Sequence, residues 1–343
     1  MQTKGFQLLE DIATAAWYSE MLFTAVEKGL FDFTSRERSL EETAAFLGFP
    51  TDAARRYLLA LAALGLLQTN NGRFLNTETA QQYLRTESPL YQGHSILWRK
   101  GLCRRWTGLT ETLTQGRRTD FPVDESQPEI EKRFCAYSFA MDDIARCKSL
   151  EIMEHYPLET ENCRILDLGS GLGAISRGFL ERWPDAEATF ADMSEVMDLC
   201  EEVLPPSLLP RIRRCAFNIL EPWDRLKGET FDLIIMSNVV HAFDLQDNLT
   251  LMGFAAEHLS PRGVILIHDF IRGHYPPKAA ALDLNMLLNT YNGRVFSEEE
   301  IHRILTEEGL VHTGLLPLPS DTALIVATAD SENLTPWIKK GTL

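Results

Sequence analysis

The chain has 343 residues, of which 45% are hydrophobic and 24% charged, as expected for a globular protein of one large or two ordinary domains. Its formal net charge of −16 argues against nucleic acid or an anionic membrane surface as a partner, because both bind to basic faces. The sequence has no apolar run of about 18 residues and begins without a basic-then-apolar pattern, so we expect neither a transmembrane helix nor a signal peptide.

The first third of the chain combines helical periodicity with a hairpin signal. Apolar residues recur at helical spacing in three segments, residues 6–30, 39–49 and 51–65. Ser39 and Glu42 have the spacing of a capping box at the start of the second segment. Asn71-Gly72, between two short extended runs, is a strong hairpin turn signal. This order of helices and hairpin predicts a winged-helix-like domain over residues 1–105.

A winged helix has two interpretations, DNA binding and packing or dimerisation. Arg55 and Arg56 are the only basic pair on the helix that would read DNA, and the acidic chain supplies no supporting field. We therefore favour a dimerisation module and expect no nucleic-acid partner. A regulator that senses a small molecule stays open as an alternative.

Residues 106–150 are expected to form a helical connector rich in aromatic side chains. A charged, proline-containing stretch near residues 117–130 predicts a loop within it. Most of the aromatic residues should be core or interface. Because Phe134 and Met141 lie just before the next domain, we expect them to help cover a substrate pocket.

From residue 151 to residue 343 the pattern changes to short apolar runs that alternate with helical segments. The runs are CRILDL, AEATFAD, RIRRCAF, FDLIIMS and GVILIHDF. This alternation predicts an α/β domain with a mostly parallel, Rossmann-like sheet of seven strands that is covered on both faces. The last two runs, GLVHTGLLPL and DTALIVATA, are separated only by a turn and predict an antiparallel hairpin at one edge.

A glycine-rich loop follows the first of these strands. Gly169, Gly171 and Gly173 let the backbone approach a ligand at positions where a Cβ atom would clash. Asp192 lies 19 residues after Gly173, at the end of the next strand, where a carboxylate can accept both hydroxyls of a ribose. The pair predicts a nucleoside ligand with free 2′ and 3′ hydroxyls.

The acid that precedes the glycines distinguishes between two nucleosides. Asp167 would repel the phosphates of a dinucleotide, but it suits a cationic ligand with an α-amino group. This favours S-adenosylmethionine over NAD. Asn218 and Ile219, after the third strand, are placed to meet an adenine ring by hydrogen bonding and packing, respectively.

At this point the sequence resembles the class I S-adenosylmethionine-dependent methyltransferases, and more closely the small-molecule O-methyltransferases of the caffeate and hydroxyindole type. The resemblance covers nearly the whole chain, through AVEKGLFD, SLEETAAFLG, RRYLLALAALGLL, LDLGSGLG, SNVVHAFDLQDN, LSPRGVILIHDF and NGRVFSEEEI. It implies a homodimer formed through the N-terminal domain. The cofactor-binding residues that we expect are Asp167, Gly169, Gly171, Gly173, Asp192, Met193, Asn218, Ile219 and Ser237.

The resemblance also places a general base at His241, which follows the strand FDLIIMS. An imidazole titrates near neutral pH and can take the proton of a hydroxyl nucleophile, while binding aligns oxygen, methyl carbon and sulfur for direct transfer. Asp269, at the end of the next strand, is expected to orient the imidazole. His268, its neighbour on the strand, is expected to face the opposite layer.

Two departures from the family pattern keep other chemistry open. The family commonly has His-Asp-Trp at the base, whereas this chain has His-Ala-Phe from His241 to Phe243. A second orienting acid aligns with Val295 and is therefore missing. Methylation at carbon or nitrogen, a repurposed enzyme and a binding module without catalysis remain alternatives to O-methylation.

The acceptor pocket is expected to include residues 283–296 together with the aromatic connector. Met286, Asn289 and Thr290 are the predicted contacts, and the acceptor is expected to be a small, flat, aromatic or polyketide-like molecule. No pair of histidines has metal-ligand spacing, so we expect no metal. The six cysteines are scattered without a CxxC pair, which favours reduced thiols and a cytoplasmic location.

Overall fold

The computed structural model describes residues 2–119, 126–157 and 161–340. The chain forms two compact units. The first contains Met1–Arg104 and Lys132–Ile144, and the second contains Arg105–Glu131 and Ala145–Leu343. The expected connector is thus divided between the two units, while the domain boundaries drawn from the sequence stay a prediction. Within the described ranges, no helix combines the length and apolar character needed to cross a membrane.

The first unit is built from helices and a small antiparallel sheet with the strand order β1-β3-β2. Its elements are α1 (Gln2–Glu27), α2 (Leu30–Phe33), β1 (Arg38–Ser39), α3 (Leu40–Leu47), α4 (Thr51–Ala63), β2 (Leu67–Asn70), β3 (Arg73–Asn76), α5 (Glu78–Tyr83) and most of α6 (Gly93–Trp106). The predicted capping box is confirmed, because Ser39 and Glu42 exchange side-chain and backbone hydrogen bonds at the start of α3. The predicted turn is confirmed as well, since Asn71 and Gly72 have φ angles of 47° and 75°.

Helix α1 presents apolar side chains to the surface. Phe6, Leu9, Ile12 and Trp17 are each about two-thirds exposed, at 65%, 66%, 65% and 67%. The core of this unit lies elsewhere, around Leu30, Phe31, Leu58, Leu61 and Phe74. An exposed apolar stripe of this kind is typical of a surface that another protein covers.

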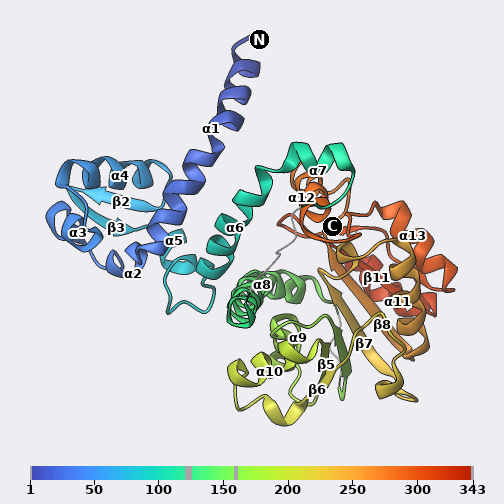
Figure 1. The fold of residues 1–343 in the computed structure, drawn as a ribbon. Coiled ribbons are helices and arrows are strands. Elements are labelled where there is room, and N and C mark those ends of the chain that lie inside the picture. The colour runs from blue at the N-terminus through green and yellow to red at the C-terminus, as the bar shows by residue number, and fades with distance from the viewer. Residues whose placement is uncertain (1, 120–125, 158–160, 341–343) are drawn as a thin grey trace. The chain divides into compact units, whose positions relative to one another are not determined.

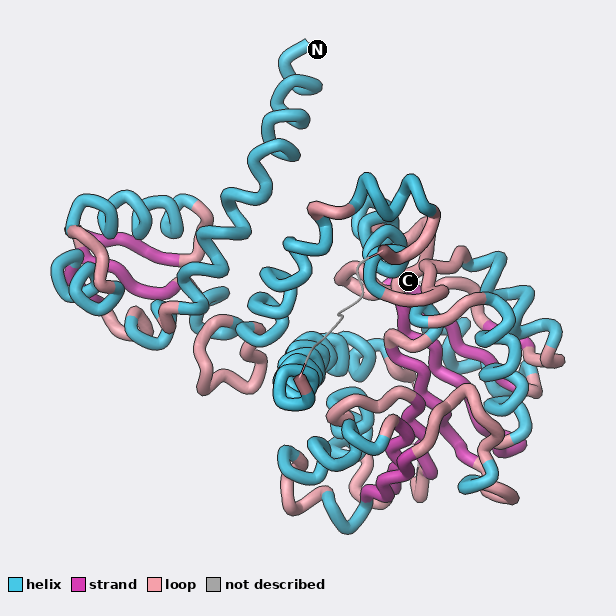
Figure 2. Tube along the Cα trace, viewed as in Figure 1, coloured by secondary structure: helices cyan, strands magenta, loops and turns pink. Residues whose placement is uncertain are grey.

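The second unit is an α/β domain with helices on both sides of one sheet (Figures 1 and 2). Its helices are α7 (Leu109–Gln115), α8 (Gln127–His155), α9 (Ala174–Arg182), α10 (Ser194–Val203), α11 (Leu245–Glu257), α12 (Pro276–Asn289), α13 (Glu298–Glu307) and α14 (Thr335–Lys340). Its strands are β4 (Arg164–Leu168), β5 (Glu187–Asp192), β6 (Ile212–Ala216), β7 (Phe231–Ser237), β8 (Leu259–Asp269), β9 (Val311–His312), β10 (Leu316–Pro317) and β11 (Ala323–Thr328). Helix α8 contributes residues to both units.

The loop expected over residues 117–130 differs from the structure at its end. Helix α8 begins at Gln127, because Ser126 and Glu129 form a capping box and Pro128 stands in the first turn, where a proline is tolerated. Residues 120–125 of the expected loop lie outside the described part of the chain. The prediction was therefore wrong for residues 127–130, where the start signals outweigh the charged, proline-containing composition.

The sheet has the strand order β10-β11-β8-β7-β4-β5-β6. Strands β4 to β8 pair in parallel and β11 pairs antiparallel to β8, as the sequence predicts. The expected last edge strand is split into β9 and β10, which both pair with β11 and bring the count to eight. The split occurs where the Thr313 hydroxyl accepts the backbone N–H of Val326, a bond that replaces part of the ladder.

Buried aliphatic side chains hold the sheet to its helices. On one face Ile234, Met236 and Ile267 pack in a cluster with residues of α11 and α13, which lie on the same side of the sheet (Figure 1). Helices α9 and α10 lie on the other side. Because both faces are covered, the carboxyl ends of the parallel strands are the place where a ligand can reach the sheet.

Candidate active site

The turn after β4 has the conformation that its three glycines allow. Gly169, Gly171 and Gly173 have φ angles of 64°, 54° and 78°, which side chains with a Cβ atom rarely adopt. A Cβ atom on Gly173 would lie 2.1 Å from the Phe190 ring, so this glycine is required for packing. A Cβ atom on Gly171 would point into open space. The turn therefore leaves room beside its backbone at Gly171, where a ligand can approach.

Asp192 ends β5 and contacts this turn directly. Its carboxylate accepts the backbone N–H of Gly171 and of Met193, each at 2.8 Å. Burial raises the pKa of Asp192, and the two N–H bonds oppose this shift. The carboxylate is half-buried, so it is held against the glycine turn and still faces solvent on one side.

Asp167 lies under the turn and is almost fully buried. Its Oδ2 atom accepts the hydroxyl proton of Ser176, at 2.6 Å, from the first turn of α9. Burial raises the pKa of Asp167 to about 7, and the nearby charge of Asp192 adds to the shift. A buried carboxyl group with this pKa gains most from a cationic partner, which would restore the ionised form.

The other predicted cofactor residues lie close to Asp192 in the fold. Met193 follows it and is half-exposed. Asn218 and Ile219 follow β6, next to the Phe217 N–H that the Asp192 carbonyl accepts. The Asn218 amide is exposed but bonds within its own turn, and Ile219 is packed in the core. The structure thus gathers these residues at one edge without giving Asn218 a free inward-facing amide.

His241 and Asp269 form a close pair at the same edge of the sheet. The Nδ1 atom of His241 lies 2.5 Å from Oδ1 of Asp269, and Oδ2 of Asp269 accepts the His241 backbone N–H at 3.1 Å. Asp269 is buried and the His241 side chain is 14% exposed. With its Nδ1 proton donated to the carboxylate, the imidazole has a lone pair on Nε2 with which to accept a proton.

The backbone around His241 is held from two sides. Its carbonyl oxygen accepts the N–H of Arg294 at 2.9 Å. The buried amide of Asn248 donates to the carbonyls of Val240 and Asp244, at 3.0 and 2.8 Å. A Cβ atom on Gly293 would lie 2.7 Å from the His241 carbonyl, so the loop that follows α12 packs directly against this segment.

Three predicted acceptor residues lie on α12 or just after it. Met286 is buried, and the Thr290 hydroxyl donates to its carbonyl at 2.7 Å and accepts the Gly293 N–H at 3.0 Å. Asn289 faces another direction, since its amide oxygen accepts from Arg105 at 3.1 Å. Thr290 is therefore the one of the three whose side chain contacts the loop beside His241.

Phe134 and Met141 belong to the part of α8 that is in the first unit. Both are partly exposed. Their role in the acceptor pocket stays a prediction.

Comparison with known proteins identifies the family. The sequence pattern of the O-methyltransferase domain matches residues 113–311, more than half of the chain, and that of the O-methyltransferase dimerisation domain matches residues 10–86. The chain belongs to the O-methyltransferase family. As the resemblance implied, it is a methyltransferase that depends on S-adenosylmethionine.

Among its relatives, the methyltransferase is 27% identical to 3-hydroxy-5-methyl-1-naphthoate 3-O-methyltransferase of Streptomyces sahachiroi, over 88% of each chain. It is 26% identical to acetylserotonin O-methyltransferase of Gallus gallus, over 83% of this chain and 86% of that protein. The crystal structure of human N-acetylserotonin methyltransferase in complex with SAM matches 95% of this chain and 98% of that chain, with a TM-score of 0.82 at 21% identity. That similarity confirms the predicted fold class.

The residues at the glycine turn fit the methyl donor. Open space lies beside the backbone at Gly171, and Asp192 carries a half-buried carboxylate that can accept hydrogen bonds from hydroxyl groups. Asp167 supplies a buried acid for an ammonium group. Within the described residues, no group of three or more His, Cys, Asp and Glu side chains is arranged to hold a metal ion.

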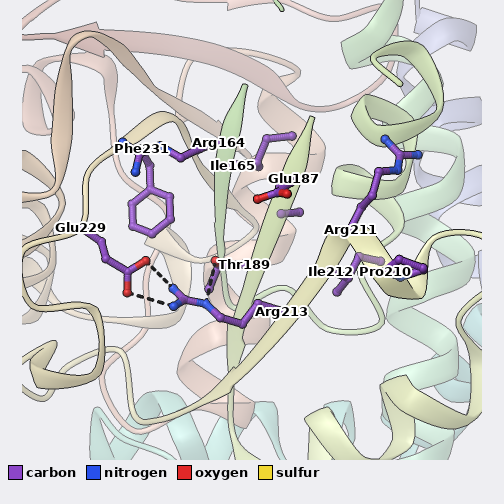
Figure 3. Close-up of a pocket in the computed structure, with 11 residues that line it drawn as sticks. Arg164, Ile165, Glu187, Thr189, Pro210, Arg211, Ile212, Arg213, Glu229 and Phe231 are labelled. Atoms are coloured by element: carbon purple, nitrogen blue, oxygen red, sulfur yellow. Dashed lines mark hydrogen bonds and ion pairs between the residues drawn. The ribbon is translucent and has the colours of Figure 1, made fainter. Parts of the chain in front are cut away.

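A cavity of about 260 Å³ lies at the opposite edge of the sheet, at the amino ends of its strands (Figure 3). Arg213 and Glu229 form a bidentate ion pair in it, and Arg213 also bonds the Thr189 hydroxyl. Because it lies at the amino ends of β4 to β7, whereas the glycine turn follows the carboxyl end of β4, we assign it no part in methyl transfer.

Sequence reasoning missed several residues that the structure brings to the site. Ser176 lies in the first turn of the helix that follows the glycines. A hydroxyl at this position could have been predicted to bond to Asp167. Asn248 and Asp283 left no such signal. Asp283 accepts the backbone N–H of Val295 at 2.7 Å, so a carboxylate reaches position 295 from α12 although Val295 itself is buried and apolar.

Proposed function

We propose that the protein transfers the methyl group of S-adenosylmethionine to a hydroxyl of a small aromatic or polyketide-like molecule, with His241 as general base. The observation that supports this most strongly is the His241–Asp269 pair. It lies at the carboxyl ends of β7 and β8, and the glycine turn follows the carboxyl end of the neighbouring strand β4. An oriented imidazole with a lone pair on Nε2 is the group that hydroxyl methylation needs, because a neutral hydroxyl is a poor nucleophile.

In this proposal the donor is held by the residues around the glycine turn. Gly171 gives backbone access, Gly169 and Gly173 allow the positive φ angles of the turn, and Asp192 accepts the ribose hydroxyls. Asp167 pairs with the α-ammonium group. Met193, Asn218, Ile219 and Ser237 complete the contacts, with Ile219 packing from the core side.

When bound, S-adenosylmethionine supplies an electrophilic methyl group on a sulfonium centre. His241 accepts the acceptor's hydroxyl proton at Nε2 as the oxygen becomes nucleophilic. Asp269 keeps the Nδ1 proton in place and stabilises the imidazolium that forms. Arg294 and Asn248 fix the backbone of the His241 segment, so the base keeps its position without a change in conformation.

The acceptor in this proposal lies against α12 and the loop that follows it. Met286 and Thr290 contact it, and Asn289 lies at its margin. Relatives at 27% identity include a naphthoate O-methyltransferase and a tetracenomycin polyketide synthesis 8-O-methyl transferase, which favours a fused-ring acceptor.

We also propose that the protein acts as a cytoplasmic homodimer through its first unit. The dimerisation-domain match over residues 10–86 and the exposed apolar residues of α1 support a dimer. Cys103, Cys135, Cys163 and Cys215 are free thiols, as a reducing compartment favours. The net charge of −16 supports a small-molecule acceptor over nucleic acid.

In the direct test, the protein is given methyl-labelled S-adenosylmethionine together with matched naphthols, naphthylamines and carbon acids as acceptors. The proposal expects labelled methyl on oxygen in the naphthol series and S-adenosylhomocysteine in equal amount. Transfer only to nitrogen or carbon would contradict O-methylation. Specific binding to duplex DNA at low salt, without transfer to any acceptor, would instead favour a regulator.

A further inference from the structure

Polar side chains line one face of the sheet at its carboxyl edge. They are Asp167 on β4, Ser237 at the end of β7, His268 on β8 and Thr322 just before β11. Ser237 and His268 are partners in the parallel ladder, and the register of β4 with β7 sets Gly169 beside Ser237. Because ladder partners direct their side chains to the same face, this row runs past the glycine turn.

His268 lies in the middle of the row and is fully buried. Its Nδ1 atom lies 2.8 Å from the Ser237 hydroxyl, and its Nε2 atom lies 2.8 Å from the Thr322 hydroxyl. Burial lowers the pKa of His268 to about 4, so the imidazole is neutral at pH 7. A neutral imidazole has one N–H donor and one lone pair, so one hydroxyl donates to the ring and the other accepts from it.

The surroundings keep His268 in this position. Lys148 from α8 forms an ion pair with Asp321 at 2.7 Å and a hydrogen bond with Ser320, which fixes the loop that presents Thr322. The carbonyl oxygen of His268 accepts the Asn238 N–H at 2.8 Å. These bonds hold the His268 backbone and the loop that carries Thr322, so the ring stays between the two hydroxyls.

Ser237 is only half-buried, whereas His268, its partner in the ladder, is fully buried. Its hydroxyl bonds to His268 and to no other side chain of the described residues. If the His268 ring donates to it from Nδ1, the Ser237 O–H is left to donate toward the glycine turn. If the ring accepts at Nδ1, the Ser237 proton is used up and the hydroxyl can only accept.

We propose that His268 is a positioning residue for the methyl donor, with its proton on Nδ1 so that the Ser237 hydroxyl donates a hydrogen bond to the carboxylate of the donor's amino-acid end. This inference rests on the proposed function. It assigns the carboxylate to Ser237 and leaves the ammonium group to Asp167 on the same face of the sheet. The chemistry of a zwitterion, one positive and one negative group, matches the two side chains.

The test measures S-adenosylhomocysteine binding by calorimetry in a double-mutant cycle of Ser237→Ala and His268→Gln. The inference predicts that each change raises the Kd about 5- to 20-fold and that the double variant binds no more weakly than Ser237→Ala alone. The unfolding midpoint of each variant is measured in parallel, because a purely structural role would lower stability and leave the Kd unchanged. Fully additive effects, or a Kd within about twofold of the wild type in His268→Gln, would overturn the inference.

A second measurement needs no substitution at the buried site. Nitrogen NMR of the histidine side chains in the wild-type protein distinguishes the two neutral tautomers. The inference predicts the Nδ1–H tautomer for His268, unchanged between about pH 5.5 and pH 8, and an altered Nδ1 shift when S-adenosylhomocysteine binds. The Nε2–H tautomer would contradict it. Failure of the wild type to bind S-adenosylhomocysteine at all would count against the proposed function itself.

Discussion

The Nδ1 atom of His241 and the Oδ1 atom of Asp269 lie 2.5 Å apart, although 28 residues separate them in the chain. Strands β7 and β8 pair in parallel, so their carboxyl ends lie side by side and bring the two residues together. Asp269 also accepts the His241 N–H through its second oxygen. One carboxylate therefore fixes both the ring and the backbone of the proposed base.

Replacing Asp269 by asparagine keeps an acceptor oxygen but removes the charge that stabilises an imidazolium. We expect Asp269→Asn to lower kcat for hydroxyl methylation about 10²-fold, with little change in the Kd of S-adenosylhomocysteine. Steady-state rates and calorimetry measure the two effects separately. A rate within a few-fold of the wild type would mean that His241 does not depend on Asp269.

Gly171 and Gly173 give a matched pair of alanine substitutions in the same turn. Gly171→Ala adds a methyl group in open space at a φ of 54°, so we expect a stability loss of about 1–2 kcal/mol and a donor Kd raised more than about 10-fold. Gly173→Ala places its methyl group 2.1 Å from the Phe190 ring, so we expect a larger loss of about 2–5 kcal/mol. Urea unfolding and calorimetry check both. Unchanged donor binding in Gly171→Ala would show that the ligand lies elsewhere.

Asp167 makes stability depend on pH in a defined direction. Its pKa in the folded state, about 7, is above the ordinary value of 3.8, so the folded protein binds the proton more tightly and loses stability as pH rises from about 4 to about 7. We expect Asp167→Asn to raise the free energy of unfolding by a few kcal/mol at pH 8 and by less at pH 5.

The same substitution should weaken binding of S-adenosylmethionine, because an amide cannot pair with its ammonium group. Wild-type binding should weaken as pH falls below about 7, and the variant should lose this dependence. Asp185→Asn, an exposed change in the turn before β5, is the control. Equal effects of Asp167→Asn on stability at both pH values would contradict the assigned pKa.

The exposed stripe on α1 predicts how the dimer can be broken. Leu9 and Ile12 are 66% and 65% exposed, and burial of both in a dimer would give a large share of its affinity. We expect Leu9→Ser with Ile12→Ser to raise the dimer Kd by about 10²-fold or more, as measured by sedimentation equilibrium. Leu113→Ser, on an exposed residue of the second unit, is the control and should leave the dimer intact. A dimer of unchanged affinity in the double variant would locate the interface elsewhere.

Local patterns in the sequence were sufficient for much of the fold. Short apolar runs predicted strands β4 to β8. The spacing of Asp192 after Gly173 predicted that this acid and the glycine turn lie together at the carboxyl ends of the strands. The expectation that His268 faces away from Asp269 follows from strand alternation, and the structure confirms it through the bonds of His268 to Ser237 and Thr322.

Contacts between distant segments were not predictable in this way. The Lys148–Asp321 pair joins residues 173 positions apart, and no periodicity in one segment reports on the other. The hydrogen bond from the Val295 N–H to Asp283 was not predictable either, because it depends on how α12 packs. The split of the edge strand lies where side chains compete with the ladder, since Thr313 accepts the Val326 N–H and Glu298 accepts the Leu315 N–H.

The central claim is that His241 activates the acceptor while other residues hold the donor. The measurement that tests it most directly compares His241→Ala with the wild type in single-turnover methyl transfer to a naphthol, alongside the Kd of S-adenosylhomocysteine. The account predicts a rate about 10²-fold lower or more, with donor affinity within about threefold of the wild type. A variant that binds the donor normally and transfers methyl at close to the wild-type rate would contradict it.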